Sequence, residues 1–233
     1  MSFLEAIFTS LLLVDVLLGA AAIFFAIKLL KGQQSKIDLF FGLSAFFLGM
    51  WLFTIPAMFI NYSEEAISIF LVTLTFLEGL LILHFFMLFT FFFPYSNERK
   101  DSKIALWFLI LSIFIGASLF IPGAYVESVV PAFPFLKVLL NPLGLTVYSI
   151  YFIALAVVSF RNLITKYNKS DGIHKTLIRK VMNGTLIAVV ANLFFSILIY
   201  FFTDFDTNPI GAPFTFFVLS YIYSIQRGVG VYK

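Results

Sequence analysis

Long apolar segments separated by short polar turns make up almost the whole chain. The most apolar segment, Ile67 to Phe93, runs for about 27 residues without Lys or Arg, and about 20 apolar residues can cross a bilayer as a helix. It has no polar face of the kind that a surface helix of a soluble domain shows. The pattern predicts an all-α polytopic membrane protein, a bundle of seven transmembrane helices in one domain, residues 1–233. The expected spans are about 4–30, 39–60, 67–93, 104–121, 139–160, 181–202 and 210–226.

Two connections are longer than the others. Between the fourth and fifth spans, prolines argue against a continuous helix, and the apolar content predicts a segment that folds over the membrane surface, for instance as a short interfacial helix. The longest polar loop, residues 161–180, contains Ser170 and Asp171, either of which could cap a helix that continues into the sixth span. The prolines of the first connection are Pro122, Pro131, Pro134 and Pro142.

The basic residues predict the orientation of the bundle. With seven spans, every Lys and Arg except Lys137 falls on one side of the membrane. Because cytoplasmic loops carry an excess of Lys and Arg, the N-terminus is predicted outside and the C-terminus in the cytoplasm. The start of the chain lacks the basic region of a secretory signal, so the first span is expected to be retained.

Composition agrees with a membrane domain and narrows the chemistry. The chain is 61% hydrophobic and 12% charged, whereas a soluble domain is about 25% charged. It has no cysteine, which excludes thiolate metal sites and a Cys nucleophile, and it contains no phosphate-binding loop, zinc-protease motif or nucleophile elbow. We expect no enzymatic activity, no cofactor and, since the net charge of +3 follows the membrane topology, no nucleic-acid partner.

Polar side chains of several spans are predicted to lie at one depth. Asp15, Glu78 and Asn192 are each about 10 or 11 residues from the outer end of their span, at about 1.5 Å per residue. Two carboxyls at this level would not both ionise easily, so they share a proton or are neutralised by a cation or a ligand amine. The alternative is a set of buried hydrogen bonds that fix helix packing. Within one turn of this candidate ligand layer lie Tyr148, Tyr151 and Ser220.

His84 is a secondary candidate. It lies six residues after Glu78, which places it about 9 Å further along an ideal helix and about 120° around it. The two side chains are therefore not expected to act as one couple, and a packed, hydrogen-bonded histidine is the favoured interpretation.

The end of the chain reads LIRKVMNGTLIAVVANLFFSILIYFFTDFDTNPIGAPFTFFVLSYIYSIQRGVGVYK. Basic residues enter the sixth span, an Asn lies within it, an acidic turn with a Pro opens the seventh, and an aromatic-basic exit follows. Together with a His-Phe pair in the third span, this resembles the seven-transmembrane sensor region at the N-terminus of many bacterial histidine kinases. The residues concerned are Asn192, Asp206, Pro209, Tyr223 and Arg227, with His84 and Phe85.

The resemblance implies a sensor or receptor module in the bacterial cytoplasmic membrane that passes a signal to a cytoplasmic output. No kinase domain follows Lys233, so either the output domain is missing from this sequence or a separate cytoplasmic signalling protein supplies it. Expected partners are the lipid bilayer, such a protein, and a second copy in a homodimer. The alternatives are a small transporter that uses Asp15 and Glu78 for proton or cation coupling, and a structural assembly factor.

Overall fold

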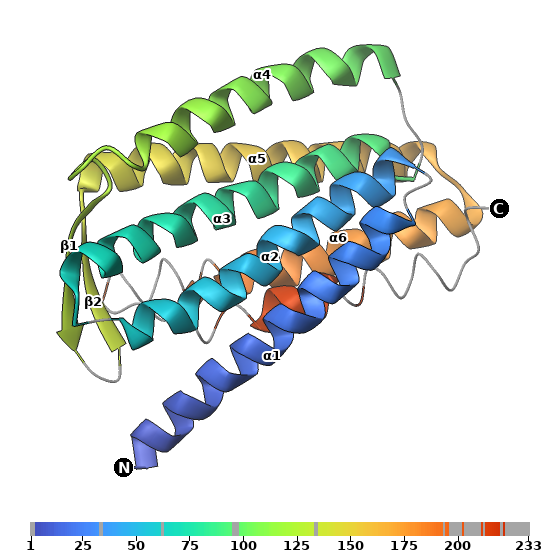
Figure 1. The fold of residues 1–233 in the computed structure, drawn as a ribbon. Helices are drawn as coiled ribbons and strands as arrows, with labels where there is room; N and C mark the ends of the chain where they lie inside the picture. Colours follow the sequence, from blue (N-terminus) through green and yellow to red (C-terminus); the bar gives the residue numbers. More distant parts are fainter. Residues whose placement is uncertain are drawn as a thin grey trace.

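The fold was analysed in a computed structural model that describes residues 3–32, 35–61, 63–94, 98–132, 135–192, 194–195, 202, 211, 213–219 and 221. Helices dominate, and one β-hairpin lies between α4 and α5 (Figure 1). The elements are α1 (Phe3–Lys31), α2 (Lys36–Ile60), α3 (Glu65–Phe92), α4 (Glu98–Ser118), β1 (Val126–Ala132), β2 (Phe135–Leu140), α5 (Pro142–Lys169) and α6 (Gly172–Asn192).

Four helices are long and apolar enough to cross a membrane: α1, α2, α3 and α5. The apolar part of α4, Lys103–Ser118, is shorter. This supports the predicted all-α membrane protein. About half of the expected seventh span, 210–226, lies outside the described residues, as does most of the second half of the expected sixth.

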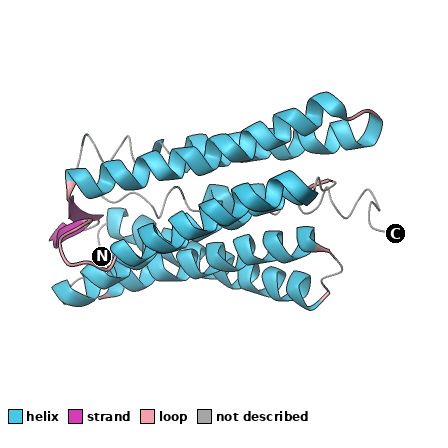
Figure 2. Ribbon diagram, turned by 90° about the horizontal axis from the view of Figure 1, so that it is seen from above, coloured by secondary structure: helices cyan, strands magenta, loops and turns pink. Residues whose placement is uncertain are grey.

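The helices run side by side, with the hairpin at one end of the bundle (Figures 1 and 2). α2 packs between α1 and α3, and α3 also contacts α4, α5 and β1. α6 packs on α5. Among the described elements, α3 therefore has the most neighbours. This central position agrees with its sequence, which is the most apolar segment of the chain.

Small residues bring α1 and α2 close together. A Cβ on Gly49 would lie 2.6 Å from Cγ1 of Ile23 and 3.0 Å from the carbonyl oxygen of Gly19. Ala22 and Ala26 continue the same buried face of α1. Helices in lipid associate through such van der Waals contact, because burying apolar surface gains little when lipid is equally apolar.

Large side chains fill the contact between α2 and α3 instead. Phe41 and Phe89 are fully buried and their ring centroids are 5.2 Å apart. Phe47 and Phe85 stack with 5.5 Å between centroids. Many of the phenylalanines that the sequence concentrates here thus act as packing groups between helices.

The connection after α4 differs from the expected interfacial helix. Val126–Ala132 and Phe135–Leu140 pair as antiparallel strands. Val129 and Val138 are directly paired and buried, while Val130 is exposed. This alternation has the period of two that a strand requires, and it is carried by β-branched residues that favour strands. Of the prolines, Pro122 lies in the turn before β1, Pro131 near the end of β1, and Pro142 at the first position of α5.

α5 begins later and ends later than the fifth span predicted from the sequence. Its first residue is Pro142, because Leu139 and Leu140 belong to β2 and the Asn141 side chain caps the helix by accepting from the N–H of Leu143 and Gly144. It continues to Lys169, and α6 begins at Gly172. The expected polar loop of 161–180 is therefore almost entirely helical, and the predicted helix entering the sixth span is present.

Candidate functional site

Glu78 is buried in α3 and faces α2. Oγ1 of Thr54 in α2 lies 2.9 Å from Oε1 of Glu78 and 3.1 Å from the carbonyl oxygen of Met50. A hydroxyl has one proton and can donate to only one of these oxygens at a time. When Thr54 donates to Met50, the contact with Glu78 requires a proton on the carboxyl group. The pair can therefore hold Glu78 in either protonation state.

Two carboxyl groups in this part of the protein have oxygens without a hydrogen-bond partner. Oε2 of Glu78 has none among the described residues, and neither oxygen of Asp15 has one. Asp15 is 0% exposed and lies on the α1 face that carries Gly19 and Ala22 toward α2. No hydrogen bond joins the two carboxyls in the described ranges: Oε1 of Glu78 bonds to Thr54, while Oε2 of Glu78 and both oxygens of Asp15 have no partner there.

A hydrogen bond from Tyr148 shows that α5 lies beside the part of α3 that contains Glu78. Its hydroxyl donates to the carbonyl oxygen of Phe76 at 2.9 Å, two residues before Glu78 in α3. A Cβ on Gly79 would lie 3.3 Å from the same hydroxyl, so the glycine leaves room for it. Tyr148 thus binds the backbone of α3 on the side that faces α5.

His84, Ser112 and Tyr151 form a chain across three helices. Oγ of Ser112 in α4 lies 2.9 Å from Nδ1 of His84 in α3 and 2.8 Å from the hydroxyl of Tyr151 in α5. The Tyr151 hydroxyl donates to the carbonyl oxygen of Phe108 at 2.7 Å. The prediction of a packed, hydrogen-bonded histidine is confirmed.

If each of the three contacts is a hydrogen bond, the proton count sets the direction of this chain. Tyr151 has one proton, which goes to Phe108, so Ser112 must donate to Tyr151. The single proton of Ser112 is then used, and Nδ1 of His84 must be the donor to Ser112. In the neutral imidazole the other nitrogen, Nε2, is then a bare acceptor, and it has no partner in the part of the chain that the structure describes.

Lys166 forms a second buried polar centre that the sequence pattern did not reveal. The sequence pattern places it in the polar loop of residues 161–180, yet it lies in α5 and is 8% exposed. Nζ donates to the carbonyl oxygens of Thr90 at 3.0 Å, Phe91 at 2.6 Å and Phe93 at 2.9 Å. Beside it, the amide of Asn162 donates to Oγ1 of Thr90 at 3.2 Å.

The remaining predicted site residues cannot be placed. Ser220 lies outside the described residues, and so does the side chain of Asn192. Among the described residues, no group of three or more His, Asp and Glu side chains could hold a metal ion. What this site offers chemically is therefore a set of buried acceptors and carboxyls on α1 and α3 that can take a proton or a hydrogen-bond donor.

Comparison with known proteins gave no match to a family model, to a curated protein or to a solved structure.

Proposed function

We propose that this chain is a membrane sensor module with seven spans and an outside N-terminus, which passes a signal to a cytoplasmic output domain or partner without catalysing a reaction. The observation that carries the proposal is the double role of α3. At mid-helix, Glu78 and His84 have buried polar atoms without partners among the described residues. At its end, the carbonyls of Thr90 and Phe91 in α3 accept hydrogen bonds from Lys166 of α5. One helix thus connects a site for a stimulus to the end predicted to face the cytoplasm.

The stimulus in this proposal is a proton or a small hydrogen-bond donor. A buried polar group without a partner costs about 1–3 kcal/mol, so a ligand that donates to Nε2 of His84 or Oε2 of Glu78 recovers part of that free energy. A ligand shifts a conformational equilibrium only by binding one state better. Binding at Glu78 or His84 would favour the arrangement of α2, α4 and α5 in which their polar side chains form hydrogen bonds to α3.

The resemblance to the sensor regions of histidine kinases supports the same proposal, as does the gathering of basic residues at one end of the bundle. α1, α2, α4 and α5 all have such residues at the end that the positive-inside rule places in the cytoplasm. We propose the bacterial cytoplasmic membrane as the location.

A proton- or cation-coupled transporter is the second candidate. It is favoured by Asp15, whose carboxyl is buried without a partner among the described residues, since ionisable groups inside membranes often belong to ion pathways. Transporters typically bind their substrate at broken helices near the midplane. α1 and α3 instead run continuously past Asp15 and Glu78, which favours the sensor.

Spin labels can test the sensor proposal directly, because a chain without cysteine accepts labels only where they are introduced. One label replaces Phe92 at the end of α3 and the other replaces Asn168 at the end of α5. In nanodiscs, we expect Glu78→Leu and His84→Leu to change the distance distribution between these labels. Thr73→Val is the matched control, since Thr73 is buried in α3 and, within the described ranges, its side chain bonds only to the carbonyl of Ile69.

Two results would decide against the sensor. An unchanged distance distribution in both variants would show that mid-helix polarity does not reach the end of α3. Proton uptake by liposomes that contain the protein, abolished by Glu78→Gln or Asp15→Asn, would favour the transporter.

A further inference from the structure

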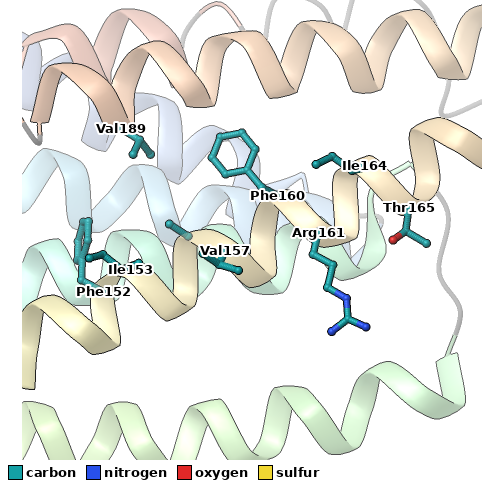
Figure 3. Close-up of a pocket in the computed structure, with 9 residues that line it drawn as sticks. Phe152, Ile153, Val157, Phe160, Arg161, Ile164, Thr165 and Val189 are labelled. Carbon is teal, nitrogen blue, oxygen red and sulfur yellow. The ribbon is translucent and has the colours of Figure 1, made fainter.

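A groove lined by α5 and by one residue of α6 combines apolar walls with a basic end. It has a volume of about 540 Å³, within the range of about 300–1,000 Å³ for small-molecule sites. Its side chains come from α5 and, through Val189, from α6 (Figure 3). The walls include Phe152, Val157, Phe160 and Ile164, and the polar groups are Arg161 and Thr165.

The height of Arg161 in the membrane is set by the length of α5. From Pro142, the start of the helix, to Arg161 is about 30 Å at 1.5 Å per residue. This equals the hydrocarbon thickness of a typical bilayer, about 30 Å. With Pro142 at one interface, Arg161 lies where phosphate groups of the opposite leaflet begin, and the apolar walls lie at the depth of acyl chains.

The polar end of the groove is free to bind an anion. Arg161 and Thr165 are exposed, and within the described ranges neither side chain has a hydrogen bond or ion pair. Figure 3 shows the guanidinium reaching outward from α5. A guanidinium fits phosphate with two parallel N–H donors, and the exposed bases Lys169 and Lys180 on α5 and α6 add to the positive charge at this end of the bundle.

We propose that this groove binds one anionic phospholipid of the cytoplasmic leaflet. The phosphate accepts hydrogen bonds from Arg161, with the Thr165 hydroxyl as a further donor, and one acyl chain lies along Val157, Phe160 and Val189. Basic sites beside apolar helix surfaces on the cytoplasmic side are suited to anionic headgroups. The inference depends on the chain lying in a membrane but not on the nature of its signal.

Photo-crosslinking with phosphatidylglycerol that carries a diazirine in one acyl chain tests the proposal in nanodiscs made of phosphatidylcholine. We expect label on peptides that contain residues 152–164 and on Val189, with displacement by unlabelled phosphatidylglycerol and not by extra phosphatidylcholine. Arg161→Gln should weaken this labelling about fivefold, the effect of one basic residue near an anionic surface. Arg179→Gln removes the same charge from an exposed site on α6 outside the groove and should keep the labelling.

A second variant tests the walls independently of charge. Val157→Trp fills the groove, so it should abolish the label there while circular dichroism confirms the helical fold. Equal displacement by both lipids, equal losses in Arg161→Gln and Arg179→Gln, or retained label in Val157→Trp would each overturn the proposal. Crosslinks in the groove to a second copy of the chain would also overturn it and would assign this face to a dimer.

Discussion

The ammonium group of Lys166 in α5 lies 2.6 Å from the carbonyl oxygen of Phe91 in the last turn of α3. The last carbonyls of a helix have no partner within it, and the negative end of the helix dipole favours a cation there. Lys166 satisfies three such carbonyls from a neighbouring helix, which explains how a lysine can be almost fully buried.

Lys166→Met should therefore destabilise the protein although it keeps the length of the side chain. The substitution leaves the three carbonyls without their donor. A hydrogen bond to a charged group contributes about 1.5–3 kcal/mol to stability, net of the hydrogen bonds that the same groups make to water in the unfolded chain. We expect a loss of at least about 3 kcal/mol in the free energy of unfolding, measured by denaturation in detergent. Lys169→Met, an exposed lysine one turn further, should change it by less than about 0.5 kcal/mol. Equal effects of the two substitutions would contradict a capping role.

The close approach of α1 and α2 gives a second prediction. Gly49→Ala places a methyl group against Ile23 and the backbone of Gly19, so the helices must separate, at a cost of about 1–3 kcal/mol. Ile23→Ala in the same chain removes the nearest clash and should recover part of that loss, which a double-mutant cycle would detect as non-additivity. Strictly additive effects in unfolding measurements would mean that the helices are not in contact at this point. Ala20→Val, on the exposed face of α1, serves as the control.

The sequence predicted these helices well because their apolar pattern has few alternatives in a membrane. It also placed Tyr148 at the level of Glu78, since depth follows from counting residues along a helix. It could not predict Thr54 or Ser112 as partners, because depth does not determine the rotation of a helix about its axis. The burial of Lys166 could not be predicted for a related reason. The charged residues around it indicated a solvated loop, whereas α5 continues through this segment and places the Lys166 side chain against α3. The hairpin was missed because its apolar residues were interpreted by hydropathy instead of by their period of two.

Thr54 and Glu78 should be energetically coupled, and Asp15 and Glu78 should not. Glu78→Gln keeps a group that can bond to Thr54 and should preserve the fold. In a double-mutant cycle with Thr54→Val and Glu78→Leu, we expect a coupling of about 1 kcal/mol, the net worth of one hydrogen bond. The cycle with Asp15→Leu and Glu78→Leu should be additive within about 0.5 kcal/mol. The opposite ranking, in thermal unfolding of the purified protein, would show that the two carboxyls share a proton or a ligand.

The direction of the chain through Ser112 predicts the tautomer of His84. With Tyr151 donating to Phe108 and Ser112 donating to Tyr151, the neutral imidazole carries its proton on Nδ1. Nitrogen chemical shifts of ¹⁵N-labelled histidine distinguish protonated from bare ring nitrogens, and the exposed His174 provides the solvated reference in the same sample. We expect a protonated Nδ1 and a bare Nε2 at His84, and in Ser112→Ala, which removes the acceptor of Nδ1, we expect that preference to be lost while the signals of His174 stay unchanged. A proton on Nε2 in the unsubstituted protein would reverse the chain, make His84 an acceptor from Ser112, and remove the bare nitrogen on which the proposed response to a hydrogen-bond donor depends.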